Sequence, residues 1–281
     1  MRGVDRMSAL YPIYVNYPIT PKPRFGGEQP PHGPLHAIIA GNRSRYETEL
    51  RAFARYAAQL AAIPYDRDET DPTQPSWNNE WFSGLDALAL YGLVSERRPN
   101  RYYEIGSGNS TMFAKRAAAD HGLTTEIVSI DPFPREEIDA ICSRVVRKPL
   151  EETDLSLFEE LEAGDVLFVD SSHYVFQNSD ANIVFLEVLP RLKAGVSIHF
   201  HDIFLPEDYP ASWAYRFYNE QYMLAACLLA QRPEEPAYEV AFPSHYVSRD
   251  PTLAVLAQTV LGAIGPQGVP SQGGSFWLTK R

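Results

Sequence analysis

Two short runs in this sequence carry the side chains best suited to chemistry. The run VDSSH contains Asp170 and His173, and the run HFHD contains His201 and Asp202. An imidazole whose pKa lies near neutrality can take a proton from a hydroxyl group. The same imidazoles and carboxylates could instead hold a divalent metal that orients and acidifies the hydroxyl. Either chemistry requires a fold that brings the two runs together.

A glycine-containing segment, EIGSGNST, lies earlier in the sequence and extends from Glu104 to Thr111, between a strand-like run and a helix-like run. Gly106 and Gly108 allow the backbone to turn tightly and to approach a ligand. Ser110 and Thr111 can cap the helix that follows. The segment therefore predicts a cradle for a nucleotide-like cofactor. The residues expected to contact this cofactor are Glu104, Gly106, Ser107, Gly108, Ser110 and Thr111.

The residue types in this segment discriminate among cofactors. A dinucleotide site requires Gly-x-Gly-x-x-Gly, and Thr111 occupies the position of the third glycine. A phosphate loop requires a lysine followed by serine or threonine, which the segment lacks. Glu104 places a carboxylate just before the turn, which would repel a pyrophosphate but suits a cationic ligand. S-Adenosylmethionine, with its ammonium and sulfonium groups, is such a ligand.

Two more carboxylates should reach the same place. Asp131 follows the hydrophobic run IVSI, and Asp170 follows the run VLFV, so each should stand at the carboxyl end of a strand. Ligands of parallel sheets bind at the carboxyl ends of the strands, where Asp131 can accept hydrogen bonds from a ribose diol. Together with Glu104, three acidic strand ends converge on one crevice. Asp131 and Asp170 therefore join the residues expected to bind S-adenosylmethionine.

The elements that must position these residues begin at Asn79, where helix-like and strand-like runs start to alternate. The helix-like runs are residues 79–95, 111–120, 135–145, 154–161, 178–192 and 213–230. The strand-like runs are residues 102–105, 126–130, 145–148, 166–169, 196–201, 238–242 and 275–279. This alternation predicts an α/β fold with a Rossmann-like, doubly wound parallel sheet that helices cover on both faces.

The N-terminal part of the chain follows a different pattern. Residues 1 to about 35 are rich in proline and tyrosine, which predicts an extended arm on the surface. Residues 44–63 have apolar side chains at helical spacing, which predicts one helix. We therefore expect an N-terminal arm and helix in residues 1–76, followed by one cofactor-binding domain in residues 77–281.

The composition narrows the partners. The chain has 281 residues with 44% hydrophobic content, which is enough for a large core. A formal net charge of −11 disfavours a nucleic-acid partner, because such partners require clustered lysine and arginine. No apolar run is long enough to predict a membrane span, and the first residues lack the pattern of a signal peptide. We therefore expect a cytoplasmic protein that acts on a small molecule.

The ordered set of motifs resembles the class I S-adenosylmethionine-dependent methyltransferases. Within that class, residues 104–111, 169–173 and 199–202 resemble the family-24 methyltransferase domains, which include macrolide-sugar O-methyltransferases. The resemblance covers the chain from about Trp77 to the C-terminus, and makes this part the methyltransferase domain. It implies a seven-stranded, mostly parallel sheet whose last two strands form an antiparallel hairpin, and it implies a homo-oligomer.

The resemblance also implies roles for the two polar runs. Asp170 would be a metal ligand, His173 would be the general base, and His201 with Asp202 would complete the metal site. The relatives carry two carboxylates where this chain has His201 followed by Asp202. A histidine in the ligand set shifts the preference from magnesium toward manganese, iron or zinc.

These observations lead to one main hypothesis and two rivals. The main hypothesis is an S-adenosylmethionine-dependent O-methyltransferase that acts on a small hydroxylated acceptor, such as a sugar or a natural product, with His173 as base. One rival is a non-catalytic S-adenosylmethionine-binding module, and the other is a metal-dependent oxygenase with two histidines and one carboxylate.

Side chains around the two polar runs receive other predictions. His199 should be a satisfied core histidine, because it lies deeper in its strand than His201. The loop 204–210 should border the site. Trp213 and Tyr215 could line an acceptor pocket or pack in the core or an oligomer contact.

Overall fold

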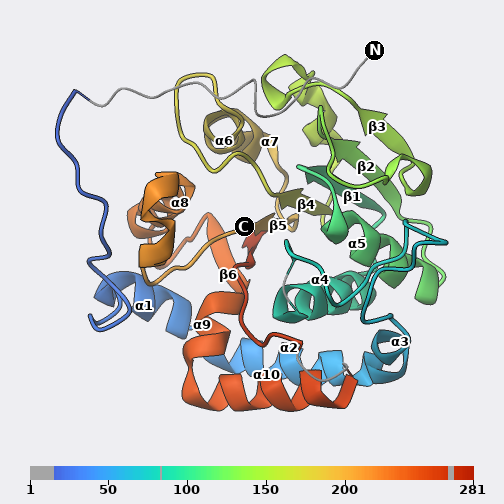
Figure 1. Cartoon of the computed structure of the whole chain (residues 1–281). Helices are drawn as coiled ribbons and strands as arrows, with labels where there is room; N and C mark the ends of the chain where they lie inside the picture. The colour runs from blue at the N-terminus through green and yellow to red at the C-terminus, as the bar shows by residue number, and fades with distance from the viewer. Residues whose placement is uncertain (1–15, 83, 265–268) are drawn as a thin grey trace.

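The computed structural model describes residues 16–82, 84–264 and 269–281, and it contains one seven-stranded sheet with helices against both faces (Figure 1). The strands are β1 (Arg101–Ile105), β2 (Glu126–Ile130), β3 (Arg144–Val146), β4 (Val166–Val169), β5 (Ser197–Phe200), β6 (Tyr238–Pro243) and β7 (Phe276–Lys280). Their order is β3-β2-β1-β4-β5-β7-β6; β1 to β5 are parallel, and β7 is antiparallel to β5 and to β6. The predicted Rossmann-like sheet with an antiparallel C-terminal hairpin is confirmed.

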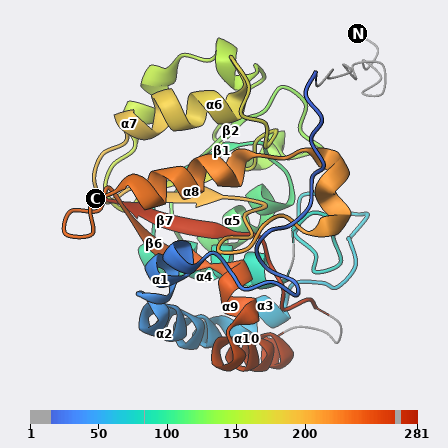
Figure 2. The same ribbon diagram turned by 90° about the vertical axis from the view of Figure 1, so that its left-hand side faces the viewer.

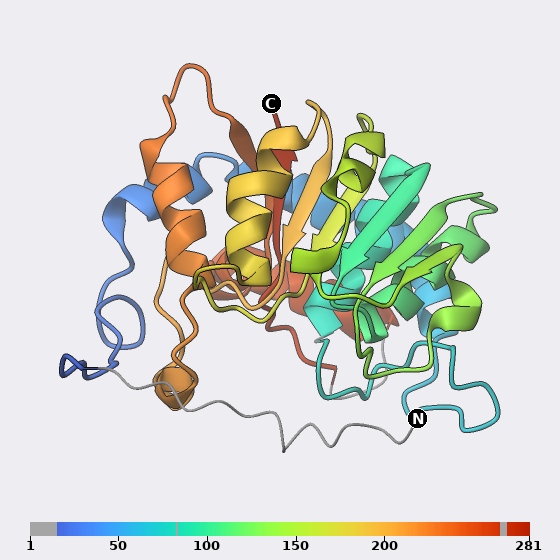
Figure 3. The same ribbon diagram turned by 90° about the horizontal axis from the view of Figure 1, so that it is seen from above.

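The helices form a layer on each side of the sheet. The α-helices are α1 (Gly33–Ala40), α2 (Arg43–Phe53), α3 (Ala57–Ala61), α4 (Gly84–Arg97), α5 (Asn109–Asp120), α6 (Asp180–Ile183), α7 (Leu189–Arg191), α8 (Glu220–Ala230), α9 (Ser244–Arg249) and α10 (Pro251–Ile264). Short 3-10 helices cover Ala54–Tyr56, Asp139–Ile141, Leu150–Glu152, Leu155–Glu160 and Ala211–Arg216, and a π-helix covers Val184–Val188. Helices α6, α7 and α8 lie on one side, and α2, α4, α9 and α10 lie on the other (Figure 2). The twisted sheet between the two layers is visible from above (Figure 3).

The central strands are buried along their length, as expected for a parallel sheet that is covered on both faces. Every residue of β4 and β5 is buried, including His199. The His199 ring stacks on Phe168 at 3.6 Å, and its Nε2 lies 2.8 Å from the hydroxyl of Ser275. Burial lowers the pKa of His199 well below its ordinary value, so this side chain is neutral. The structure thus places His199 in the core, as predicted, but its Nδ1 has no hydrogen-bond partner among the described residues, so the histidine is satisfied only at Nε2.

Three predicted helices differ from the structure. Residues 135–145 hold only the 3-10 helix and the start of β3, because β3 pairs with β2 and Arg147 binds Ser129 Oγ and the Asp131 carbonyl at 3.0 Å each. The run 213–230 is interrupted at Phe217, whose φ of 54° ends the 3-10 helix before α8 begins. The predicted helix 154–161 is likewise a 3-10 helix. In residues 135–145, strand pairing overrides an apolar spacing that favours a helix.

The N-terminal helices share the core of the sheet domain. Helix α2 packs against α4 and α10, and its side chains Tyr46, Leu50 and Phe53 are buried. A Cβ at Gly92 of α4 would lie 2.1 Å from the Phe53 ring, so the two helices are in close contact. The predicted helix 44–63 exists as α2 and α3 with a 3-10 turn between them, whereas α1, α9 and α10 were not predicted.

The arm that precedes these helices is described in part. Residues 1–15 of the predicted arm lie outside the described residues. The backbone N–H groups of Arg24 and Phe25 donate to the Asp208 carboxylate at 2.6 and 3.0 Å. The described part of the arm therefore lies on the loop that follows β5. None of the helices in the described ranges is long and apolar enough to cross a membrane.

Candidate active site

The register of the sheet aligns four of the predicted site residues. Strands β1, β2, β4 and β5 are followed directly by Gly106, Asp131, Asp170 and His201, respectively. The last residues of neighbouring strands in this set pair with each other across the sheet. The backbone N–H groups of Gly106, Asp170 and His201 donate to the last carbonyl group of a neighbouring strand at 3.1, 2.8 and 2.9 Å. The predicted convergence at one sheet edge is therefore present, beside the point where the strand order reverses.

A cavity of about 1170 Å³ opens at this edge. The glycine turn and Asp131 line one part of it, and His173, Asp202 and Tyr218 line another. Pockets for single drug-sized ligands have volumes of about 300–1,000 Å³. The cavity therefore has room for a cofactor and a second small molecule side by side.

The glycine turn depends on Gly106. Its φ is +78°, and a Cβ at this position would lie 1.9 Å from the carbonyl oxygen of Asp170. Only glycine satisfies both conditions, because a side chain is disfavoured at this φ and the backbone of β4 leaves no space. A Cβ at Gly108 would meet nothing nearer than Glu136 Cγ at 3.9 Å, so Gly108 faces the open cavity.

Asp131 is held in a fixed position at the end of β2. Its Oδ2 accepts a hydrogen bond from the backbone N–H of Ser107 at 3.0 Å, and its Oδ1 accepts one from Phe133 at 2.7 Å. The Ser107 hydroxyl is in turn bound by Ser129 at 2.8 Å. Each carboxylate oxygen of Asp131 keeps a free lone pair, as the predicted contact with a ribose diol requires.

Glu104, Ser110 and Thr111 form a buried group behind the turn. The Glu104 carboxyl accepts hydrogen bonds from the hydroxyls of Ser110, Thr111 and Tyr102. Burial raises the pKa of Glu104 to about 8, although these hydrogen bonds oppose the shift. Thr111 Oγ1 also accepts the backbone N–H of Gly108 at 3.0 Å. Glu104 and Thr111 thus anchor the turn, and their direct contact with a cofactor stays a prediction.

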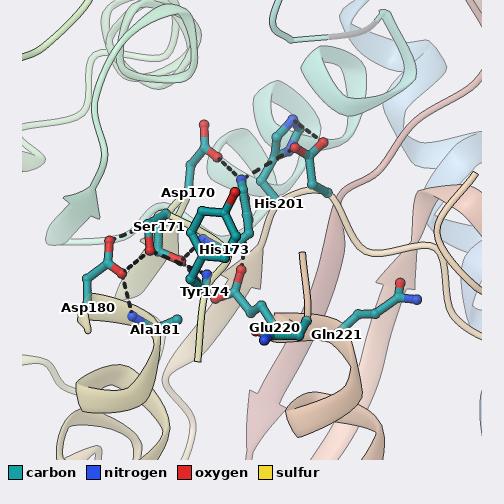
Figure 4. Close-up of polar contacts among 12 residues, drawn as sticks. Asp170, Ser171, His173, Tyr174, Asp180, Ala181, His201, Glu220 and Gln221 are labelled. Carbon is teal, nitrogen blue, oxygen red and sulfur yellow. Dashed lines mark hydrogen bonds and ion pairs between the residues drawn. The ribbon is translucent and has the colours of Figure 1, made fainter. Parts of the chain in front are cut away.

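His173 lies among three carboxylates (Figure 4). Its Nδ1 is 2.8 Å from Glu220 Oε2, and its Nε2 is 3.4 Å from both Asp170 Oδ1 and Asp202 Oδ2. Burial alone would lower the pKa of His173, but the hydrogen bonds with Asp170 and Glu220 and the charge of Asp202 outweigh it and hold this pKa well above its ordinary value. The arrangement favours a histidine that readily accepts and keeps a proton.

The backbone of His173 is also fixed by α8. His173 has a φ of 64°, which costs a non-glycine residue about 1 kcal/mol or more. Its carbonyl oxygen accepts the backbone N–H groups of Asn219 and Glu220 at 3.1 and 3.2 Å. Glu220 was missed by the sequence reasoning, because nothing in its local pattern distinguishes it from a surface glutamate on a helix.

His201 and Asp202 follow β5 directly. The His201 ring packs near Phe82 at 5.4 Å, and its Nε2 lies 3.8 Å from Asp202 Oδ1. Burial lowers the pKa of His201, but the charges of Asp170 and Asp202 outweigh it and raise this pKa above its ordinary value. Asp202 has a φ of 57°, so His173 and Asp202 both have left-handed backbones.

The predicted metal ligands do not form a metal site. Throughout the part of the chain that the structure describes, no group of three His, Cys, Asp or Glu residues could hold a metal ion. His173 Nε2 lies 3.4 Å from one oxygen of Asp170 and one of Asp202, so the imidazole occupies the place between the two carboxylates. We therefore derive no step through a metal, and the described residues supply no metal site for the oxygenase hypothesis.

The strand order agrees with the class I methyltransferase fold that the motifs resemble, and comparison with known proteins gives a family match for the central part of the chain. Residues 103–203 match the model of the family-24 methyltransferase domain, which supports the predicted class for this segment. A protein of Archaeoglobus fulgidus described as uncharacterized is 35% identical over 91 residues, which are 30% of this chain. The chain spans 41% of the length of that relative.

Two solved structures are similar in fold at low identity. A methyltransferase of Podospora anserina bound to S-adenosylhomocysteine is 15% identical, with 92% of this chain and 100% of that chain covered and a TM-score of 0.41. An O-methyltransferase of Bacillus cereus in complex with S-adenosylhomocysteine is 15% identical, with 88% and 100% covered and a TM-score of 0.39. At these scores neither structure adds to the argument, which rests on the family match and on the geometry above.

Proposed function

We propose that this chain is an S-adenosylmethionine-dependent O-methyltransferase that acts on a hydroxyl group of a small acceptor. The proposal rests on one observation: the glycine turn, Asp131 and His173 line the same cavity. The turn and Asp131 supply the cradle, and His173 supplies a buried imidazole beside it. Cofactor binding alone would not require a histidine held by three carboxylates, so this arrangement favours an enzyme over a non-catalytic binding module.

The residues have separate tasks in the proposed reaction. S-Adenosylmethionine, when bound, supplies the methyl group, and Gly106, Gly108 and Asp131 would hold it. Glu220 holds His173 through Nδ1 at 2.8 Å, which in the neutral ring fixes the N–H at Nδ1 and makes Nε2, between Asp170 and Asp202, the atom that takes a proton. During methyl transfer to the acceptor oxygen, the hydroxyl proton would go to Nε2. Asp170 and Asp202 then stabilise the imidazolium.

Calorimetry and a turnover assay test the proposal in two stages. Wild-type protein should bind S-adenosylhomocysteine, and Gly106→Arg or Asp131→Ala should abolish or strongly weaken the binding. His173→Ala should keep the cofactor affinity near wild type and abolish methyl transfer, because the side chain acts on the acceptor. Unchanged turnover in His173→Ala would place the base elsewhere, and a wild-type protein that does not bind the cofactor would contradict the whole proposal.

A further inference from the structure

An arginine that belongs to none of the sequence motifs lines the cavity. Arg216 belongs to the insertion between β5 and α8. Its guanidinium carbon lies 4.0 Å from the centre of the Trp213 ring and 5.4 Å from that of Tyr218. All three side chains line the cavity. The two rings therefore hold the guanidinium plane in place by cation–π contact.

The charge of Arg216 has no acidic partner among residues 16–82, 84–264 and 269–281. Its side-chain hydrogen bond goes to the hydroxyl of Tyr215 at 3.4 Å, and no carboxylate lies within 4.0 Å. By contrast, Arg249, which also lines the cavity, pairs with Glu207 at 3.4 Å. In a chain with a net charge of −11, a cation that faces a cavity without a carboxylate partner is an available anion site.

Tyr218 connects this arginine to the proposed base. The ring centres of His173 and Tyr218 are 4.6 Å apart, and the guanidinium carbon of Arg216 lies 5.4 Å from the Tyr218 ring centre. The hydroxyl of Tyr174 donates to the carbonyl oxygen of Arg216 at 2.7 Å, which fixes the backbone of the insertion beside His173. A flat acceptor in contact with Tyr218 could therefore reach His173 at one end and Arg216 at the other.

We propose that the acceptor is a hydroxylated ring that carries a carboxylate, and that Arg216 binds this carboxylate. The inference rests on the proposed methyltransferase function and adds the substrate class. A guanidinium presents two parallel N–H donors that match the two oxygens of a carboxylate, and Trp213 and Tyr218 suit the face of a ring. Trp213, Arg216 and Tyr218 are then the specificity-determining residues of the acceptor site.

Equilibrium binding of matched probes to the protein saturated with S-adenosylhomocysteine tests the inference. The probes are 3,4-dihydroxybenzoate against catechol, and D-glucuronate against D-glucose, with Kd measured by ligand-observed NMR titration. In at least one pair the carboxylate should bind about tenfold or more tightly than its neutral partner, because a hydrogen-bonded charge contributes on this scale. Arg216→Met should reduce the preference to about twofold or less, and Arg216→Lys should keep part of it.

Arg135→Met is the matched control. Arg135 also lines the cavity and lies 4.3 Å over a tryptophan ring, that of Trp81, but it belongs to the segment that follows β2. This variant should keep the carboxylate preference of the wild-type protein. Neutral probes that bind as tightly as the carboxylates, a preference that survives in Arg216→Met, or no measurable binding of either carboxylate would overturn the inference. Binding of S-adenosylhomocysteine itself is measured separately, so failure of the proposed function is distinguished from failure of the acceptor assignment.

Discussion

Replacement of Gly106 by alanine tests whether the turn after β1 is as tightly built as its geometry indicates. The added Cβ would lie 1.9 Å from the Asp170 carbonyl oxygen, at a φ of +78°. Two costs follow from these values. The left-handed backbone costs a residue with a Cβ about 1–2 kcal/mol, and the clash with β4 costs about 1–3 kcal/mol if the strand end must move. We expect the free energy of unfolding to fall by about 2–5 kcal/mol.

Gly122→Ala separates the two costs. Gly122 also has a positive φ, +58°, but an added Cβ would meet no atom within 4 Å. This variant should therefore lose only the backbone contribution of about 1–2 kcal/mol. Gly108→Ala serves the opposite purpose, because it fills the cavity where the nearest atom is 3.9 Å away. It should leave the stability near wild type and weaken binding of S-adenosylhomocysteine.

Urea unfolding followed by far-ultraviolet circular dichroism measures all three variants, with calorimetry for the cofactor. At about 2 °C per kcal/mol for a chain of this size, the melting temperature of Gly106→Ala should fall by roughly 4–10 °C. If Gly106→Ala and Gly122→Ala lose the same stability, the contact with Asp170 adjusts freely, and the turn does not tie β1 to β4. If Gly108→Ala binds the cofactor like wild type, Gly108 is not part of the cradle.

Three further expectations concern two ionisable groups and the metal. Glu220→Gln removes a carboxylate that raises the pKa of His173, so the pH at which kcat/KM rises should shift to a lower value. If the pH dependence of kcat/KM is the same as in wild type, Glu220 does not control the protonation of His173. Glu104 has a pKa of about 8 in the folded chain against an ordinary 4.5, so the folded state holds an extra proton between these values. The unfolding free energy should therefore fall as pH rises through this window, by at most about 5 kcal/mol. Urea titrations should show that Glu104→Gln makes this dependence on pH weaker. If the variant and the wild type have the same dependence, Glu104 ionises normally. Dialysis against EDTA should leave turnover unchanged, because the predicted donors do not form a metal site; loss of activity restored by manganese or magnesium would contradict this reading.

The sheet could be predicted because its signals are local and strong. The run of β4 is continuously apolar, and β1 and β2 are buried from their second residue onward, as expected for parallel strands covered on both faces. The helices were less predictable. Residues 135–145 have helical spacing, yet pairing with β2 turns their end into a strand. The break at Phe217 depends on a contact with the loop after β4, which no local pattern reports.

The same distinction divides the site. The cofactor side was predictable because Gly106, Ser107 and Asp131 belong to short motifs at strand ends, whose neighbours follow from the sheet order. The acceptor side was not, because Arg216 reaches the cavity, and Glu220 reaches His173, only through the path of the insertion after β5. The tryptophan at 213 was noted as a candidate, but no sequence pattern shows that an arginine three residues later lacks an acidic partner.

The insertion after β5 therefore connects specificity to catalysis in one segment. Arg216 and Tyr218 would recognise the acceptor, and the next two residues, Asn219 and Glu220, hold His173 through its carbonyl oxygen and its Nδ1. His173 has a left-handed backbone, a conformation that persists only where neighbours over-determine it. A change in this insertion that shifts the start of α8 would release the base together with the acceptor pocket. Acceptor range can therefore change through the side chains of residues 213–218, whereas the backbone path that delivers Glu220 to His173 has to be kept.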